Sequence, residues 1–430
     1  MLITSVKITP IAVQDPPLLN SEGVHQTHAL RSVIQVHTDE GLTGLGETYG
    51  DDQMLVWLRA VARKLPGTDP FATNVLMATV TEVMEELAGD SANEVPVGAG
   101  YPMAGAASSK TKAAVFSAFE VACLDIQGKA LGRPLHDLLG GKVRDAVPYS
   151  AYLFYKWAEH PDAPYPADSW GEALTPDAMV AQARRMVETY GFTSLKLKGG
   201  VLRPGLEVDT VLALHDAFPD YPIRIDPNAA WTVDVAVEVG QRLEGALEYL
   251  EDPVGGTPAM AEVARKVSMP LATNMCVTAF EDIPEAVREG APQVILSDHH
   301  FWGGMRQSQV LDGLCQTFGL SLSMHSNTHL GISLAAMTHF GAVSRSLAYS
   351  CDTHTPWQTE EIIVPGTLGF ENGAVRVPDG PGLGVELDED AVARLHEQWV
   401  KCGVRTRDDV TPMKAVHPEW TGETPRFTSL

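Results

Sequence analysis

The chain has 430 residues, of which 44% are hydrophobic, so it is long enough for one large barrel and a second domain. Its formal charge of −24 argues against a nucleic-acid partner, because binding phosphates requires a basic surface. Solubility is the ordinary reason for such a charge. An anionic substrate would need cations gathered locally in its site.

The cysteines and the first residues bear on location. Five cysteines lie in apolar surroundings without CxxC spacing, which favours reduced thiols over a disulfide framework. The start, MLITSVKITPIAV, alternates like a strand and lacks the charged start and long apolar centre of a signal peptide. No apolar run approaches the length of a membrane span. We therefore expect a cytoplasmic protein without a membrane partner.

Residues 1–132 are expected to form an α+β capping domain. Apolar periodicity predicts strands at 3–13, 32–37 and 44–48, and helices at 54–64, 71–87 and 112–130. Two polar loops rich in Gly, Pro and Ala interrupt this unit at 15–28 and 89–110. Loops of this length in a compact domain are usually functional or disordered. We expect both to cover the mouth of a neighbouring barrel.

From residue 148 the pattern alternates between short apolar runs and amphipathic stretches. Strands are predicted at 148–154, 193–198, 222–226, 247–251, 270–274, 293–298, 320–325 and 347–352. Helices are predicted at 178–190, 208–218, 233–244, 259–267, 280–289, 305–318 and 331–343. This alternation favours an α/β protein with a modified, TIM-like (β/α)8 barrel over 133–385. The segment 386–430, with a helix at 389–401, is expected to pack back toward the capping domain.

Polar residues end most of these strands, about one βα unit apart. They are Lys196 and Lys198, Asp226 and Asn228, Glu251, Asn274, Asp298 and His325. In a parallel barrel the carboxyl ends of all strands open into one mouth. We therefore expect these side chains to converge. Together they suit removal of a proton from the carbon next to a metal-bound carboxylate.

Asp226, Glu251 and Asn274 are oxygen donors on successive strands, which favours a hard divalent cation such as Mg²⁺. Two carboxylates neutralise the ion and the amide adds no charge, so the ion could still attract a substrate carboxylate. Taken singly, each residue equally suits a helix cap or a turn. Three at consecutive strand ends favour the metal site.

Lys196 and Lys198 alternate with leucine in SLKLKGG, so both point to one side of their strand. Neighbouring ammonium groups are expected to lower each other's pKa, and a lysine with a lowered pKa can act as a base. The alternative is an exposed edge strand with two solvated lysines, which the flanking leucines and the following glycines disfavour.

His325 closes the run LSLSMH, and Asp298 closes QVILSD one strand earlier. Asp298 could hold one ring nitrogen of His325 and make the other a stronger base. A buried structural histidine is the alternative, and it is our interpretation of the neighbouring His299, His300 and His329. A lysine on one side and a histidine on the other would allow a proton to leave from either face of a carbon.

Segments along nearly the whole chain carry a family resemblance. They include LLNSEGVH, GLTGLGE, GFTSLKLKGGVL, DPNAAW, ATNM, SDHHFW, HSNTH, SCDTH, PGLGVEL and the RDD that begins at residue 407. With these segments the chain resembles the enolase superfamily, and within it the glucarate dehydratase subgroup. The resemblance implies a homo-oligomeric, Mg²⁺-dependent hydro-lyase that acts on a dicarboxylic or monocarboxylic sugar acid. D-Glucarate or L-idarate would lose water through an enediolate to give 5-dehydro-4-deoxy-D-glucarate.

The resemblance also implies a role for each site residue. Asp226, Glu251 and Asn274 would bind Mg²⁺. Lys198, with Lys196 beside it, would be one base, His325 with Asp298 the other, and Asn228 would help to stabilise the enediolate. The implied substrate contacts are Asn20, His25, Tyr152, Ser326, Asn327, His354 and Arg426.

The second loop departs from the subgroup. Related dehydratases present a threonine and an aromatic residue there, whereas this chain has Ala106 and Ala107 in YPMAGAASSKTK. The resemblance therefore covers the residues for proton removal but not this part of the substrate contacts. Three alternatives stay open: a related dehydratase or epimerase acting on another aldarate or aldonate, a Schiff-base aldolase using Lys198, and a non-catalytic protein that binds sugar acids.

Overall fold

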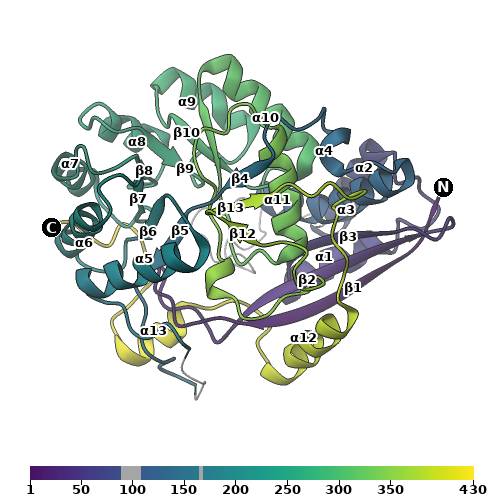
Figure 1. Ribbon diagram of the computed structural model, residues 1–430, viewed down its shortest axis with the longest axis horizontal. Helices are drawn as coiled ribbons and strands as arrows, with labels where there is room; N and C mark the ends of the chain where they lie inside the picture. Colours follow the sequence, from purple (N-terminus) through teal and green to yellow (C-terminus); the bar gives the residue numbers. More distant parts are fainter. Residues whose placement is uncertain (89–107, 164–167) are drawn as a thin grey trace.

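The computed structural model describes residues 1–88, 108–163 and 168–430. Ala106 and Ala107, where the sequence departs from the glucarate dehydratase subgroup, lie outside these residues, as does most of the second loop. Figure 1 shows an antiparallel N-terminal sheet at one end of the molecule and a ring of parallel strands wrapped in helices at the other. The capping domain and the modified (β/α)8 barrel predicted from the sequence are both confirmed.

The capping domain is a three-stranded antiparallel sheet covered by helices. Its strands are β1 (Ile3–Gln14), β2 (His28–Thr38) and β3 (Thr43–Tyr49), in the order β1-β2-β3. Its helices are α1 (Asp52–Ala62), α2 (Thr73–Ala88) and α3 (Ser108–Leu131). A Cβ atom at Gly44 or Gly46 would collide with carbonyl groups of Ala122 and Ala118, so glycine allows α3 to lie directly on β3.

The barrel strands form one parallel sheet in the order β11-β10-β9-β8-β7-β6-β5. They are β5 (Ala151–Phe154), β6 (Leu195–Lys198), β7 (Ile223–Asp226), β8 (Tyr249–Glu251), β9 (Leu271–Thr273), β10 (Val294–Ser297) and β11 (Ser321–Met324). The helices are α5 (Pro176–Tyr190), α6 (Pro204–Ala217), α7 (Val233–Arg242), α8 (Thr257–Ala264), α9 (Ile283–Glu289), α10 (Gly304–Phe318) and α11 (Gly331–Val343). They cover the outside of the strands, as alternation of buried runs and amphipathic segments predicts (Figure 1).

The prediction of an eighth regular strand at 347–352 is wrong. That segment forms only isolated bridges, between Leu322 and Leu347 and between Tyr149 and Cys351. These bridges still connect β11 on one edge with the start of β5 on the other, so the segment closes the ring without being a regular strand. A bend at Tyr349 and the polar Ser350 interrupt the apolar run that a full strand needs.

The rest of the chain ties the two parts together. α4 (Leu135–Leu138) links them, and β4 (Ala146–Pro148) pairs with β13 (Ala374–Arg376), which pairs in turn with β12 (Phe370–Glu371). α12 (Glu389–Cys402) lies along β1, where Gln398 donates a hydrogen bond of 3.0 Å to the carbonyl oxygen of Ala12. α13 (Val410–Val416) was not predicted, because its seven residues carry too little periodicity.

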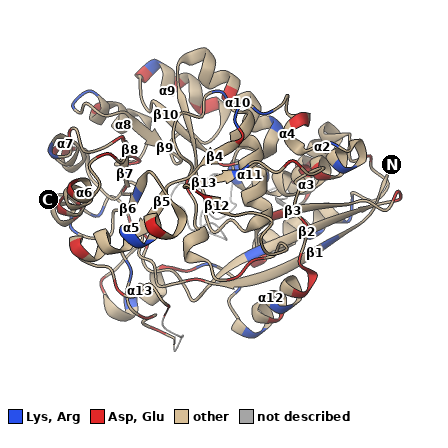
Figure 2. Ribbon diagram, viewed as in Figure 1, with Lys and Arg blue, Asp and Glu red and all other residues tan. Residues whose placement is uncertain are grey.

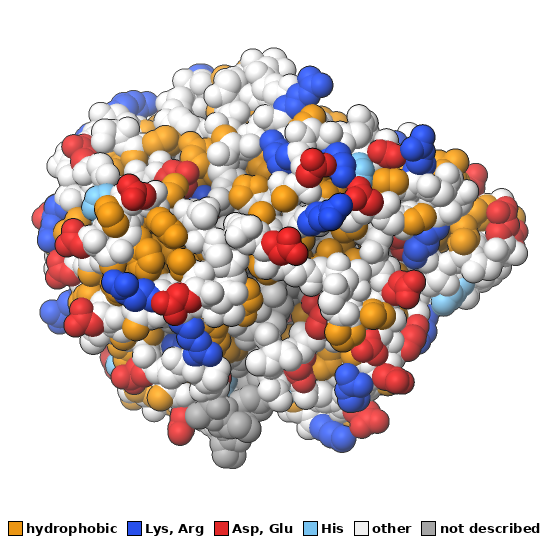
Figure 3. Space-filling view, viewed as in Figure 1, with side chains coloured by type: hydrophobic (Ala, Val, Ile, Leu, Met, Phe, Trp, Pro, Cys, Tyr) orange, Lys and Arg blue, Asp and Glu red, His pale blue; other side chains and the backbone are white. Residues whose placement is uncertain are grey.

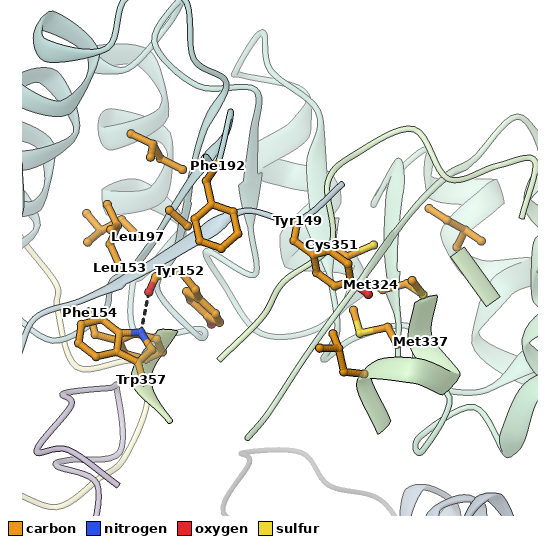
Figure 4. Close-up of a cluster of buried hydrophobic side chains, with 14 of the residues drawn as sticks. Tyr149, Tyr152, Leu153, Phe154, Phe192, Leu197, Met324, Met337, Cys351 and Trp357 are labelled. Atoms are coloured by element: carbon orange, nitrogen blue, oxygen red, sulfur yellow. Dashed lines mark hydrogen bonds between the residues drawn. The ribbon is translucent and has the colours of Figure 1, made fainter. Parts of the chain in front are cut away.

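Aromatic and aliphatic side chains fill the space between β5, β6 and the closing segment. Figure 4 shows Tyr152, Phe154 and Trp357 packed together, with Trp357 Nε1 donating a 2.8 Å hydrogen bond to the carbonyl oxygen of Tyr152. This cluster forms a rigid wall next to the strand ends. Such packing fixes the position of side chains that project from those ends.

Charged side chains of both signs are interspersed on the outer helices, for example on α5 and α12 (Figure 2). The face in Figure 3 likewise mixes acidic, basic and hydrophobic side chains, without a basic patch on that face. Among the described helices, none has the length and apolar character required to cross a bilayer.

Candidate active site

The carboxyl ends of β6, β7 and β8 bring the predicted lysines and acids together. Lys198 and Asp226 are register partners on neighbouring strands. Nζ of Lys198 donates hydrogen bonds of 2.6 Å to Oδ2 of Asp226 and 2.8 Å to Oδ1 of Asn228. All these side chains are buried or nearly so, so their charges interact at short range in a region from which bulk water is largely excluded.

Lys196 lies deeper than Lys198. Its Nζ donates hydrogen bonds of 2.8 Å to Oε1 of Glu251 and 2.6 Å to Oδ2 of Asp352. Burial alone would lower the pKa of Lys196, but Asp352 and Glu251 outweigh burial and raise that pKa well above its usual value. The expectation that the two lysines lower each other's pKa is therefore wrong for Lys196, which is held as a cation.

Asp352 is a site residue that the sequence analysis missed. It is the last residue of the predicted strand at 347–352, so it occupies the same strand-end position as the other polar residues. That position was the signal that could have identified it. Its carboxylate gives Lys196 a second anionic partner, from the segment that closes the ring.

Asp226, Glu251 and Asn274 lie at the ends of three successive strands, β7, β8 and β9, and Nζ of Lys196 lies 3.7 Å from Asp226 and 2.7 Å from Glu251. Burial raises the pKa of Asp226, but Lys198 and Lys196 outweigh burial and lower it. Burial and the neighbouring Asp226 raise the pKa of Glu251 well above its usual value, because two buried carboxylates repel each other. A cation between them would relieve that repulsion.

Asn274 supports the same conclusion. Its backbone is fixed on both sides, since its N–H donates to Oδ2 of Asp252 at 2.8 Å and its carbonyl oxygen accepts from Nζ of Lys110 at 2.9 Å. Its buried side-chain amide, in contrast, has no hydrogen-bond partner among the described residues. A buried amide without a partner is costly. The three predicted ligands therefore fit a hard divalent cation.

On the other side of the mouth, Nδ1 of His325 lies 3.2 Å from Oδ2 of Asp298. Burial would raise the pKa of Asp298, but His300 and His329 outweigh burial and hold that pKa well below its usual value. Because an ionised carboxylate can only accept hydrogen bonds, Nδ1 of His325 is the donor. Its other ring nitrogen, Nε2, is left free to accept a proton.

Asp298, His300 and His329 also place ligand atoms within 4.8 Å of one another. Oδ1 of Asp298 already accepts a hydrogen bond from the backbone N–H of His300 and lies 2.8 Å from Nδ1 of the same residue. Oδ2 faces His325. We therefore assign the divalent cation to the oxygen-rich group around Asp226.

A cavity of about 450 Å³, including the part open to solvent, lies between these two groups. Its lining contains both predicted bases and most of the predicted substrate contacts. The lining residues are Asn20, Glu22, His25, Tyr152, Phe154, Lys198, Asn228, His325, Ser326, Asn327, His354 and Arg407. The structure therefore brings loop 15–28 and the strand ends to one space, with Lys196 and Asp298 behind its wall.

The predicted substrate contacts and the residues that line the cavity differ at two arginines, Arg426 and Arg407. Arg426 stacks on Trp420 with its Cζ 3.5 Å from the ring centre, donates to the carbonyl oxygen of Ser21 at 2.6 Å, and does not line the cavity. Arg407 does line the cavity and is paired with Asp409 at 2.7 Å. Arg407 begins the RDD segment that carries part of the resemblance, and the sequence pattern alone indicates no role for it.

Three residues at the mouth of the barrel have unusual backbone conformations. Asn228, Asp252 and Thr328 follow β7, β8 and β11, and their φ angles are 49°, 35° and 48°. Residues other than glycine rarely adopt this left-handed region, and such strain concentrates where a site must present a side chain in one direction. Asn228 illustrates this, since its side-chain oxygen is turned to Lys198.

Comparison with known proteins agrees with this geometry. Residues 3–140 match the mandelate racemase / muconate lactonizing enzyme N-terminal domain, and residues 178–391 match the enolase C-terminal domain-like family. The fold and the strand-end site define an enzyme of this class. The chain belongs to the enolase superfamily.

Individual relatives are similar over their whole length. A Streptomyces coelicolor protein named "probable glucarate dehydratase" is 52% identical, with 99% of each chain covered. An enolase from Thermobispora bispora, complexed with magnesium and formate, is 55% identical with a TM-score of 0.95, covering 99% of this chain and 100% of its own. An enolase from Pseudomonas fluorescens with bound magnesium, potassium and tartrate is 48% identical with a TM-score of 0.94, with 99% of each chain covered.

Proposed function

We propose that this protein is a Mg²⁺-dependent acid-sugar dehydratase, a hydro-lyase, and that D-glucarate is the first substrate to test. The observation that carries the proposal is the convergence of Lys198 and His325 on one cavity, with Asp226 hydrogen-bonded to Lys198 and with Glu251 and Asn274 at the ends of the next two strands. The similarity to a protein named "probable glucarate dehydratase" supports the choice of substrate. The magnesium bound to solved relatives supports the choice of ion.

Asp226, Glu251 and Asn274 would hold the ion. When bound, Mg²⁺ supplies positive charge that lowers the energy of an enediolate and so makes the α-proton of the substrate more acidic. Lys196, which is held as a cation, adds positive charge on the same side. Lys198 contributes a further hydrogen-bond donor, and the amide of Asn228 holds it in place.

The proton steps belong to Lys198 and His325. Neutral Lys198, or Nε2 of His325, takes the proton α to a carboxylate, and the C–H electron pair moves into that carboxylate to form the enediolate. The electrons then return to form a carbon–carbon double bond as the β-hydroxyl leaves. When His325 is the base, it gives the proton that it has taken to the departing oxygen. When Lys198 is the base, His325 begins the cycle protonated on Nε2 and gives that proton, so that water is released. The resulting enol becomes the keto acid by gaining a proton on carbon.

The cavity suits a polyhydroxy diacid. Oγ of Ser326 and Nδ1 of His354 are buried without hydrogen-bond partners among the described residues, so each can bond a substrate hydroxyl. Arg407 supplies a guanidinium that can pair with a second carboxylate. The tartrate bound to the Pseudomonas fluorescens relative is itself a short dihydroxy diacid. These features favour an aldarate over an aldonate.

The test is a screen of aldaric and aldonic acids with Mg²⁺ that detects keto-acid formation. We expect D-glucarate or another aldarate to react, a chelator to abolish the reaction, and borohydride added with substrate to leave the enzyme active. A Schiff-base aldolase would behave in the opposite way, since borohydride would trap an imine at Lys198. If a sugar acid binds without any loss of its α-hydrogen, the protein is a binding protein and the proposal fails.

A cytoplasmic location and a homo-oligomeric state stay predictions. Size-exclusion chromatography coupled to light scattering would determine the second, and cell fractionation the first.

A further inference from the structure

Histidine rings surround the carboxylate of Asp298 behind the cavity wall. The ring nitrogens of His299, His300, His325 and His329 lie 3.9, 2.8, 3.2 and 3.5 Å from its oxygens. Of these rings only His325 lines the cavity. The other three rings do not line the cavity, so any effect they have on proton transfer is expected to pass through their contacts with Asp298.

His300 makes the tightest of these contacts. Its ring Nδ1 lies 2.8 Å from Oδ1 of Asp298, and its backbone N–H donates to the same oxygen at 2.9 Å. The carboxylate can only accept, so Nδ1 of His300 carries a proton. Because Oδ1 is fixed by two donors, the carboxylate cannot rotate, and Oδ2 is turned to Nδ1 of His325.

The far side of the His300 ring contacts the capping domain. Its Nε2 lies 3.1 Å from the carbonyl oxygen of Glu47 on β3 and 3.3 Å from Oγ of Ser333 on α11. The Glu47 carboxylate is itself fixed by buried Arg31 at 2.7 Å and by the backbone N–H of Ser333 at 2.9 Å. His300 therefore sits between the capping sheet and the barrel: with its proton on Nδ1, the neutral ring can accept at Nε2 from the hydroxyl of Ser333, and it packs beside the carbonyl group of Glu47.

We propose that His300 is a positioning residue that, anchored by Glu47 and Ser333, fixes Asp298 so that His325 keeps its proton on Nδ1 and presents a free Nε2 to the substrate. The catalytic meaning of this inference rests on the proposed function. Its structural content, the tautomer of His325, does not. The capping domain then contributes to the chemistry of one base as well as covering the mouth.

The first experiment measures the tautomer directly, by ¹⁵N NMR of protein labelled in its histidine rings, with His325→Gln used to assign the signal of His325. We expect the wild-type protein to show protonated Nδ1. His300→Leu and His300→Gln should shift the signals toward the Nε2-protonated form, because neither keeps a donor at the Nδ1 position. His300→Asn, whose amide lies near that position, should stay close to wild type. Unchanged signals in all three variants would overturn the inference.

The second experiment measures exchange of the substrate α-hydrogen in D₂O for D-glucarate and L-idarate, which differ in configuration at one carbon. Each epimer is first assigned to a base with Lys198→Ala and His325→Ala. His300→Gln should slow exchange of the His325-dependent epimer by about tenfold or more and leave the other epimer within about twofold. His300→Asn should restore most of the loss.

The matched control is His339→Asn, a buried histidine on α11 whose Nε2 lies 3.0 Å from the carbonyl oxygen of Leu383, away from the cavity. It should change neither epimer. Equal loss for both epimers in the His300 variants would indicate a general structural role and overturn the inference. If the wild-type protein exchanges neither epimer, the proposed function fails, and the tautomer measurement still decides the role of His300.

Discussion

At the scale of single residues, the site depends on opposite charges placed within hydrogen-bond distance in a buried region. Strand periodicity and the parallel arrangement made it possible to predict from sequence that Lys198, Asp226 and Glu251 converge. The protonation state of Lys196 could not be predicted. It depends on Asp352, which lies 156 positions along the chain and meets Lys196 only when the ring closes.

The substitution Asn274→Asp tests whether the metal site needs an uncharged third ligand. The added negative charge should leave Mg²⁺ binding intact but oppose the enediolate, and a penalty of about 1.4 kcal/mol at the transition state slows turnover tenfold. Calorimetric titration with Mg²⁺ and kcat measure the two effects separately. Asn372→Asp, in the turn between β12 and β13, is the matched control and should change neither. Unchanged turnover in Asn274→Asp would contradict the role given to this residue.

Arg407→Lys tests recognition of a second carboxylate. Lysine keeps the charge but cannot form two parallel hydrogen bonds. KM for an aldarate should rise about tenfold, which corresponds to about 1.4 kcal/mol. KM for the matching aldonate should change little. Arg426→Lys, outside the cavity lining, serves as the control. An equal rise for both substrates would mean that Arg407 holds the loop through Asp409 and does not read the substrate.

At the scale of elements, loops after the strands carry the site, and buried acids fix those loops. Glu207 on α6 accepts hydrogen bonds from the backbone N–H groups of Gly200, Val201 and Leu202, at 3.0, 2.9 and 3.0 Å. This holds the chain immediately after Lys198. The sequence predicted the helix but gave no sign that one of its acids turns back to the preceding loop.

Glu207→Ala should therefore both destabilise the protein and weaken catalysis. Three buried N–H groups would lose their acceptor, and the loss should reach at least about 2 kcal/mol in the free energy of unfolding. Denaturant titration measures this loss, and kcat reports the displacement of Lys198. Glu238→Ala, an exposed acid on α7, is the control. A stability equal to wild type would show that the loop keeps its shape without Glu207.

At the scale of the whole molecule, the sequence predicted the order of the layers better than the closure of the ring. Short apolar runs alternating with amphipathic stretches indicated the barrel, and the N-terminal strands indicated the cap. The closing segment bridges both edges through single residue pairs, Leu322 with Leu347 and Tyr149 with Cys351, and such isolated pairs leave no periodic pattern. Contacts such as that of Glu47 with His300 depend on how cap and barrel dock, which no local pattern encodes.

Buried histidines make the stability of the whole molecule sensitive to acid. Burial lowers the pKa of His329 and of His339 from 6.5 to about 4. Because these folded-state pKa values are depressed, each histidine contributes stability that is present above pH 6.5 and lost as the pH falls toward about 4. In that pH window, each of these histidines lowers the free energy of unfolding by about 1.4 kcal/mol per pH unit.

His339→Gln should flatten this dependence. The amide can replace the contact to Leu383 but cannot bind a proton, so the loss of stability between pH 6.5 and pH 4 should be smaller than in the wild-type protein. Denaturant titrations at several pH values measure the slope. The exposed His417→Gln is the control and should keep the wild-type slope. An identical slope in His339→Gln would mean that other groups set the acid limit.

Two bases facing one substrate carbon from opposite sides, with a divalent ion beside them, are the core of the proposed site. A crystal structure of the protein with Mg²⁺ and tartrate tests this most directly. We predict the ion on Asp226, Glu251 and Asn274, with a tartrate carbon between Nζ of Lys198 and Nε2 of His325. An ion bound elsewhere, or both bases on one side of the ligand, would contradict the account.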